Sequence, residues 1–166
     1  RPYAFLDYHS MTLTEHPPRR ACDHNVVCKV AKPRDSRLLF SLQKAYEMEE
    51  VLLDPSRFNP HSCMLSLQRN LRKELVVYAL KHGEAVAKAG TNAQGLEFVQ
   101  LGGVYTVKEL RNRGVGELVL GELLERIIAS GKSASLFVKK NNPAAIQLYK
   151  KLKFRTQGEF RIAYYR

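Results

Sequence analysis

The feature that most constrains the fold is a glycine-containing turn between a strand-like run and a helical run. The run FVQLGGVYTV, residues 98–107, is rich in β-branched and aromatic residues and predicts a strand, with Gly102-Gly103 marking a bulge. The turn RNRGVG, residues 111–116, follows it, and GELVLGELLERII then has the spacing of a helix that Gly131 ends. A strand that passes through glycines into a helix predicts a sheet covered by helices.

The rest of the chain supplies further strands and helices in a mixed order. Strand-like runs occupy residues 3–8, 26–31, 75–80, 84–90, 134–138 and 159–165. Helical spacing begins at Ser36 and continues to Leu52, a second helix follows Pro60, and Asn142-Pro143 opens another. The pair His82-Gly83 predicts a tight hairpin between two of the strands. The expected fold class is therefore α/β (α+β), a sheet with helices on both faces.

Composition is that of a folded domain with a strongly basic surface. The 166 residues are 45% hydrophobic and 26% charged, and no apolar run approaches the length of a membrane-spanning helix. The net charge of +11 favours an anionic partner such as nucleic acid, a membrane surface or a phosphorylated ligand. We expect no membrane partner. Nucleic acid is disfavoured, because aromatic residues do not interleave with the basic ones and no nucleic-acid-binding motif occurs.

The cysteine and histidine pattern argues against a metal centre. His9, His16, Cys22, His24 and Cys28 gather near the start of the chain, but their irregular spacings lack the paired ligands typical of zinc sites. We therefore expect no metal. The three cysteines, an odd number without a framework spacing, indicate a reducing, cytoplasmic setting.

The glycine turn alone allows two interpretations. It lacks the Gly-Lys-Ser/Thr of a Walker A loop and the spacing of GxGxxG. The unpaired amides at the start of a helix lie at the positive end of its dipole, so the turn can bind a phosphate, and Arg111 and Arg113 add positive charge. For the hexapeptide alone, we favour the other interpretation, a plain helix start with solvated arginines.

A second segment, NNPAAIQLYKKLKF from Asn141 to Phe154, shifts the balance. Alone, it predicts a capped helix with Tyr149 on its apolar stripe, where a core tyrosine is the simplest interpretation. With the glycine turn, it resembles the two signature motifs of the GNAT superfamily of acyl-CoA-dependent N-acetyltransferases. These are Arg/Gln-x-x-Gly-x-Gly/Ala between a strand and a helix, then Asn-x-x-Ala-x-x-Leu-Tyr-x-x-x-Gly-Phe. The resemblance is specific over residues 98–154, rests on pattern alone over 34–97, and does not extend to 1–33.

The resemblance implies a fold, a reaction and a set of site residues. The fold is a mixed, mostly antiparallel central sheet with helices on both faces. The activity is direct transfer of acetyl from acetyl-CoA (coenzyme A) to a primary amine, without a covalent acyl-enzyme. Its implied cofactor-binding residues are Val104, Tyr105, Thr106, Arg111, Asn112, Arg113, Gly114, Val115, Gly116, Glu117, Asn142, Ala145 and Tyr149. Tyr149 is the implied catalytic residue, a general acid that protonates the leaving thiolate.

The sequence departs from the family pattern at several positions. Lys108 replaces the usual proline after the binding strand, and Lys153 replaces the glycine before the phenylalanine. Many relatives carry an acid on the strand before the turn, whereas here only Glu97 and Glu109 lie near it. The general base therefore stays open between these residues and a water relay.

The acceptor is not identified by the sequence. The run YEMEE, with Glu47, Glu49 and Glu50, suits a cationic amine, but we favour a solvated helix face. Basic clusters at residues 69–73, 139–140 and 150–151 suit either the ribose phosphate of the coenzyme or plain surface charge. Two alternatives to the enzyme remain, an acyl-CoA-binding sensor or interaction domain without catalysis, and a basic nucleic-acid-binding module.

The chain is expected to have two parts. Residues 1–33 form an extended segment or linker, and residues 34–166 form the acetyltransferase domain. Three roles stay open for residues 1–33: a link to an upstream domain, packing on the core, or contact within a homodimer.

Overall fold

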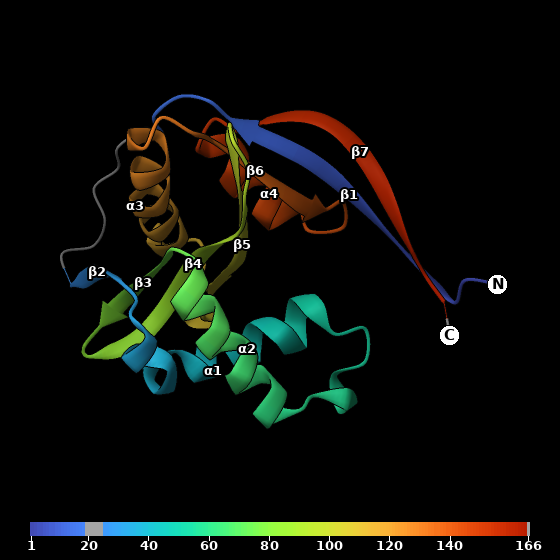
Figure 1. The fold of residues 1–166 in the computed structure, drawn as a ribbon, viewed down its shortest axis with the longest axis horizontal. Coiled ribbons are helices and arrows are strands. Elements are labelled where there is room, and N and C mark those ends of the chain that lie inside the picture. Colours follow the sequence, from blue (N-terminus) through green and yellow to red (C-terminus); the bar gives the residue numbers. More distant parts are fainter. Residues whose placement is uncertain (19–24, 166) are drawn as a thin grey trace.

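The computed structural model describes residues 1–18 and 25–165, which form a seven-stranded sheet with helices around it (Figure 1). The strands are β1 (Ala4–Leu13), β2 (Val26–Val30), β3 (Val76–Lys81), β4 (Glu84–Gln94), β5 (Phe98–Thr106), β6 (Ser133–Lys139) and β7 (Arg155–Tyr164). Their order across the sheet is β2-β3-β4-β5-β6-β1-β7, and neighbours are antiparallel except β5 and β6. The expected mixed, mostly antiparallel sheet is confirmed.

Helices cover both faces of the sheet, as expected. They are α1 (Ser36–Tyr46), α2 (Pro60–Lys73), α3 (Val115–Ala129) and α4 (Pro143–Lys151), joined in places by the short helical turns η1 (Pro33–Asp35), η2 (Glu47–Val51), η3 (Pro55–Arg57) and η4 (Lys108–Leu110). Alternate residues of β3 point to opposite faces. Val76 and Tyr78 pack under α1 and α2, whereas Val77 and Ala79 join the larger core under α3 and α4.

Local sequence explains the turns that connect these elements. The Asn59 side chain accepts a hydrogen bond of 3.0 Å from the Ser62 amide at the start of α2, with Pro60 in the first turn. His82 and Gly83 have φ values of 50° and 81°, as a two-residue type I′ turn requires. The hairpin predicted at these two residues is confirmed by the pairing of β3 with β4.

Helices α3 and α4 end with the same backbone turn but different residues. Gly131 follows α3 with φ 80°, and Lys153 follows α4 with φ 73°. After α4, the Lys153 amide donates to the Lys150 carbonyl and the Phe154 amide to the Tyr149 carbonyl, both at 3.0 Å. Lys153 therefore takes the left-handed conformation that glycine adopts without steric cost.

Strand β1 lies inside the sheet, between β6 and β7. It pairs with β6 from Tyr8 to Leu13 and with β7 along most of its length, beginning at Ala4 opposite Tyr164. Beyond β6, β1 and β7 continue as a two-stranded arm that projects from the body and brings the two ends of the described chain together (Figure 1). Residues 1–33 thus supply β1 and β2, and their derivation from an upstream domain stays a prediction.

The first helix is shorter than the sequence predicted. It ends at Tyr46 and continues as the π-turn η2, so the helix does not reach Leu52. Leu38 is 39% exposed, whereas Leu39 and Gln43 are buried. A π-turn contains more residues per turn than an α-helix, so it changes the direction of the side chains that follow.

Candidate active site

A cavity opens where β5 and β6 separate. In the described part of the chain these strands pair only from Phe98 opposite Ser133 to Gln100 opposite Ser135. Beyond that point, residues 101–106 of β5 and 136–139 of β6 line opposite walls of a cavity of about 520 Å³. This volume is typical of small-molecule sites. The backbone edge of β5 is thus free to pair with an extended ligand.

The glycine turn closes one end of this cavity. Gly114, with φ 80°, is the residue before the first turn of α3. A Cβ atom on Gly116 would lie 3.2 Å from the Thr106 hydroxyl, whereas one on Gly114 would meet nothing within 4 Å. Glycine at Gly114 thus suits the backbone angle of the turn, and a side chain at Gly116 would press on the Thr106 hydroxyl of β5. The first residues of α3 line the cavity at this end, so the positive end of the helix dipole lies there.

Most residues named from the sequence line the cavity. Those that do are Val104, Tyr105, Thr106, Arg111, Asn112, Gly114, Gly116, Glu117, Asn142, Ala145 and Tyr149. Arg113 and Val115 do not. The Arg113 side chain is exposed on the surface, and Val115 is 2% exposed in the core under α3. The role of each lining residue stays a prediction.

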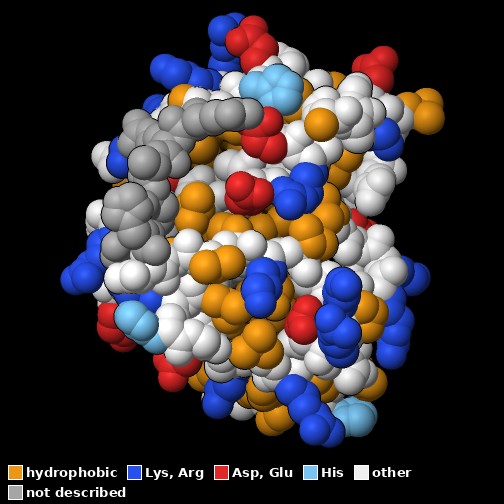
Figure 2. All heavy atoms as spheres, turned by 90° about the vertical axis from the view of Figure 1, so that its left-hand side faces the viewer, with side chains coloured by type: hydrophobic (Ala, Val, Ile, Leu, Met, Phe, Trp, Pro, Cys, Tyr) orange, Lys and Arg blue, Asp and Glu red, His pale blue; other side chains and the backbone are white. Residues whose placement is uncertain are grey.

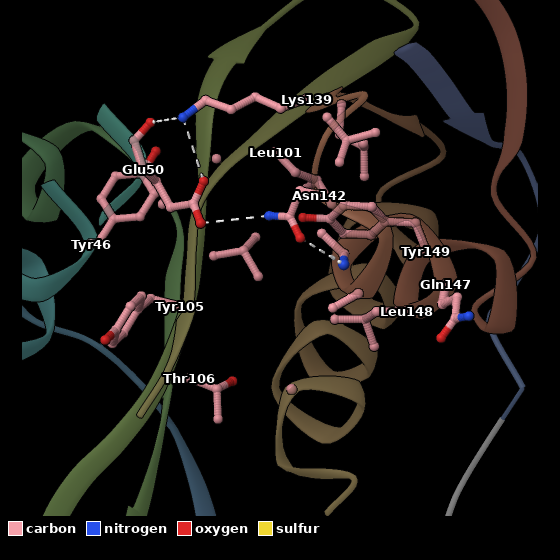
Figure 3. A pocket seen from close by; sticks show the side chains of 18 of the residues that line it. Tyr46, Glu50, Leu101, Tyr105, Thr106, Lys139, Asn142, Gln147, Leu148 and Tyr149 are labelled. Carbon is pink, nitrogen blue, oxygen red and sulfur yellow. Dashed lines mark hydrogen bonds and ion pairs between the residues drawn. The ribbon is translucent and has the colours of Figure 1, made fainter. Parts of the chain in front are cut away.

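Tyr149 reaches the cavity from α4. It is 7% exposed, and its ring packs edge-on against Phe154 with 5.7 Å between ring centroids. Figure 3 shows it beside Asn142, with Glu50 on the other side of that amide. Burial first, and then the charges of Tyr46 and Glu50, raise the pKa of Tyr149 well above its usual range. The phenol therefore stays protonated at neutral pH.

The acidic run of η2 is not the solvated helix face that we favoured. Each of its three carboxylates contacts a different part of the molecule. Glu47 accepts a hydrogen bond of 3.0 Å from Gln43, and Glu49 contacts β5 and the glycine turn. Glu50 lies 3.5 Å from the Asn142 amide nitrogen at the start of α4. The π-turn explains the difference, because it directs neighbouring side chains toward separate partners.

Glu49 joins η2 to the glycine turn. One carboxylate oxygen accepts from the Tyr105 hydroxyl and the other from Arg111, both at 2.8 Å, and Lys108 is 3.5 Å away. Arg111 also donates to the Thr106 carbonyl at 3.0 Å. Burial and the bond to Glu49 raise the pKa of Tyr105 to about 12. The Arg111 side chain is thus held by protein groups at the cavity wall.

Two of the basic clusters contribute to the cavity. Lys139 donates a hydrogen bond to the Glu50 carbonyl, and its ammonium lies 3.6 Å from the Glu50 carboxylate (Figure 3). Lys151 lies 3.3 Å from the Glu117 carboxylate in the first turn of α3. The cluster at residues 69–73 belongs to α2 and does not line the cavity.

A buried lysine supports the bulge in β5. The register between β4 and β5 shifts after Lys88, and Gly103 at the bulge has φ 61°. The Lys88 ammonium donates a hydrogen bond of 2.8 Å to the Gly103 carbonyl and lies 4.8 Å from the centre of the Tyr46 ring. Burial lowers the pKa of Lys88 to about 8, while Cys63 and Glu47 act in the opposite direction. Lys88 thus fixes a carbonyl that has left the regular strand ladder.

The acids near the glycine turn in sequence lie outside the cavity. Neither Glu97 nor Glu109 lines it, and both are exposed. The lining carboxylates are Glu50 and Glu117. Sequence reasoning missed Glu50 as a site residue because nothing local distinguishes it from Glu47 and Glu49. Its place in the acidic run YEMEE was the one available signal.

The histidines and cysteines near the start of the chain show no metal-binding group in the part that the structure describes. His9 pairs with Glu159 at 3.3 Å and His16 with Glu125 at 2.9 Å. Cys22 and His24 lie outside the described residues. Among the described helices, none is both long and apolar enough to cross a membrane.

On the face formed by α3 and β2, the basic residues are dispersed (Figure 2). Figure 2 shows Lys and Arg side chains dispersed among hydrophobic and acidic ones on this face, without a single continuous stripe. A nucleic-acid backbone favours a connected basic surface, so this face does not support the nucleic-acid alternative.

Solved structures with the same fold include several acetyltransferases. A GNAT-family acetyltransferase structure from Novosphingobium aromaticivorans aligns with a TM-score of 0.72 at 20% identity, covering 98% of this chain and 65% of that one. An acetyltransferase of GNAT family from Streptococcus pneumoniae aligns with a TM-score of 0.66 at 23% identity, covering 80% of this chain and 86% of that one. A predicted acetyltransferase with acetyl-CoA from Clostridium acetobutylicum aligns with a TM-score of 0.64 at 17% identity, covering 80% of this chain and 91% of that one.

These likenesses establish the fold. The chain spans less than two thirds of the Novosphingobium structure's length. No curated protein matches the sequence. The model of the family described as FR47-like protein matches residues 78–162, just over half of the chain, including the glycine turn, both cavity walls and Tyr149. The protein is therefore a member of the FR47-like family in the GNAT superfamily.

Proposed function

We propose that this domain binds acetyl-CoA in the cavity and transfers the acetyl group directly to a primary amine. The observation that carries the proposal is that one cavity joins three features separated in sequence. These are the glycine turn at Gly114, the unpaired edge of β5, and Tyr149. Each suits a different part of the same elongated molecule.

The cavity residues fit coenzyme A in their chemistry. The α3 amides and the glycine turn suit the pyrophosphate, because they offer hydrogen-bond donors and the positive end of a helix. Residues 104–106 do not pair with β6, and apart from the Thr106 carbonyl, which Arg111 binds, their backbone suits the amides of the pantetheine arm. Glu117 is the one carboxylate at this end, and Lys151 partly neutralises its charge. Bound acetyl-CoA would supply an acetyl thioester, a carbonyl open to attack by an amine.

The side chains suit direct transfer rather than a covalent acyl-enzyme. The described cysteines, Cys28 and Cys63, do not line the cavity, and burial raises the pKa of Cys63 to about 12. A thiol with that pKa is a poor nucleophile at neutral pH. Tyr149 lines the cavity, and its phenol suits the role of proton donor to a departing sulfur.

Thermal stability with acetyl-CoA tests the binding proposal. A ligand that binds only the native state raises the melting temperature. We expect a shift for the wild type and its loss in Gly114→Glu, whose carboxylate would enter the phosphate end of the cavity. Gly131→Glu is a matched control, because Gly131 has the same φ of 80°, the same open space and no contact with the cavity. Absence of a shift at millimolar acetyl-CoA would refute the proposal.

Tyr149→Phe tests the acid role. The substitution keeps the ring that packs on Phe154, so the acetyl-CoA shift should remain. Release of free thiol in the presence of an amine should slow on the order of a hundredfold, as expected for loss of a general acid. Equal turnover by the variant and the wild type would remove Tyr149 from this role. A shift without turnover, over a panel of amines, would instead favour the acyl-CoA sensor.

A further inference from the structure

We infer that Glu50 receives the ammonium group of the acceptor and takes its first proton. The inference rests on the proposed acetyl transfer and names the base that the sequence left open. It comes from the position of Glu50 in the cavity and from the unused hydrogen-bonding capacity of its carboxylate.

Glu50 stands across the cavity from Tyr149. It projects from η2, whereas Tyr149 projects from α4, and both line the same space (Figure 3). The two groups are close enough that the charge of Glu50 acts on the Tyr149 phenol. Amine acetylation needs a proton acceptor at the nitrogen and a proton donor at the sulfur. The cavity thus holds one group of each kind, on opposing elements.

The Glu50 carboxylate is only loosely held by the protein. Its oxygens lie 3.5 Å from the Asn142 amide and 3.6 Å from the Lys139 ammonium. Charge-assisted hydrogen bonds are normally about 2.7–2.9 Å long. The close contact of Lys139 is to the Glu50 carbonyl instead. A carboxylate has about four acceptor positions, so Glu50 retains room for an ammonium donor.

Its neighbours in the same turn are committed elsewhere. Both oxygens of Glu49 accept hydrogen bonds of 2.8 Å, from Tyr105 and Arg111. Glu47 accepts from Gln43 and does not line the cavity. The Glu50 side chain is 34% exposed, so an incoming molecule can reach it. Of these three acids, Glu50 alone combines access with open acceptor positions.

Aromatic rings line the same cavity as Glu50. They belong to Tyr8 of β1, Tyr46 of α1, Phe137 of β6 and Tyr164 of β7. Electrostatic effects of Glu50 reach Tyr8 and Tyr46 as well as Tyr149. Aromatic faces attract cations, and a carboxylate among them favours an ammonium over a neutral group. The acceptor class is therefore a primary ammonium with an apolar flank.

The proton balance is complete with these two side chains. Glu50 accepts one proton from the ammonium and passes it to solvent, which leaves a neutral amine. Its nitrogen forms a bond to the acetyl carbon, and the carbon–sulfur bond breaks with its electron pair on sulfur. Tyr149 gives its proton to that sulfur and recovers one from the nitrogen. One ammonium and one thioester thus yield one amide, one thiol and one released proton.

Amine binding to the protein saturated with coenzyme A tests the inference without turnover. Butylamine and phenethylamine are the probes, and thermal shift is the readout. We expect both to stabilise the wild type and to bind Glu50→Gln at least tenfold more weakly. Coenzyme A should still bind this variant. Glu47→Gln is the matched control, because it removes a carboxylate from the same turn outside the cavity, and it should bind amines like the wild type.

Turnover gives a second readout that a structural defect would not reproduce. Glu50→Gln should acetylate the probe amines on the order of a hundredfold more slowly near neutral pH. The deficit should shrink as pH approaches the pKa of the amine, because the free base then needs no proton acceptor.

The outcomes separate the two proposals. Failure of the wild type to bind coenzyme A or acetyl-CoA would refute the proposed function. Coenzyme A binding with equal amine affinity in Glu50→Gln and the wild type would overturn the role of Glu50 alone. The role of Glu50 would also be overturned if amines did not bind the wild type saturated with coenzyme A. A loss of acetylation rate in Glu50→Gln that stays constant with pH would overturn it as well.

Discussion

The buried ammonium of Lys88 should make the stability of this protein rise with pH in the alkaline range. Lys88 is 5% exposed, and burial lowers its pKa from 10.5 to about 8. Between these values the unfolded chain holds a proton that the native protein has lost, so unfolding becomes less favourable as pH rises. The stabilisation is present above pH 10.5 and is lost as pH falls through about 8.

The magnitude follows from the size of the shift. Each pKa unit corresponds to about 1.4 kcal/mol, so the shift of Lys88 contributes about 3 kcal/mol between these two pH values. Lys88→Met keeps the length of the side chain and removes the titrating group. It also leaves the Gly103 carbonyl without its donor, at a cost of about 1–3 kcal/mol that does not depend on pH.

Urea unfolding at several pH values measures this effect. The difference in free energy of unfolding between wild type and Lys88→Met should change by about 3 kcal/mol from pH 8 to 10.5, in favour of the wild type at high pH. Tyrosines that do not contact Lys88 titrate alike in both proteins, so the difference cancels their contribution. Lys29→Met, at an exposed position of β2, is the control. Its free energy of unfolding should change with pH in parallel with that of the wild type. If the free energy of unfolding of Lys88→Met also changed with pH in parallel with that of the wild type, the reasoning would be refuted.

Three further changes test other parts of the fold. Lys153→Gly should raise the free energy of unfolding by about 1 kcal/mol, because φ is 73° there, and a loss of stability in urea would contradict this. Gly131→Ala should lower the free energy of unfolding by about 1 kcal/mol at the equivalent turn of α3, because Gly131 has a φ of 80°. An unchanged urea midpoint would count against strain at these turns. Glu49→Gln should weaken acetyl-CoA binding, since Arg111 loses its anchor beside the glycine turn; unchanged affinity by calorimetry would show that the anchor is dispensable. It should also lower stability by about 1 kcal/mol, measured by urea unfolding.

The parts of the site that could be read from the sequence are those fixed by local backbone chemistry. Gly114 and Gly116 mark a turn that a side chain would strain at the first position and crowd at the second, and Asn142 caps α4 with its own side chain. The His82-Gly83 hairpin has the same local origin. Such signals lie within a few residues of each other, so they are visible without the fold.

The tertiary structure decided what those segments face. The π-turn after α1 separates Glu49 from Glu50, and only the packed molecule shows that one holds Arg111 while the other opens into the cavity. Lys88 likewise has an ordinary place in a strand pattern, yet the fold buries it against the Gly103 carbonyl. These contacts join residues far apart in sequence, and their energies depend on burial and distance. The sequence therefore determined the glycine turn and the helix caps, whereas long-range packing decided which charges meet in the site.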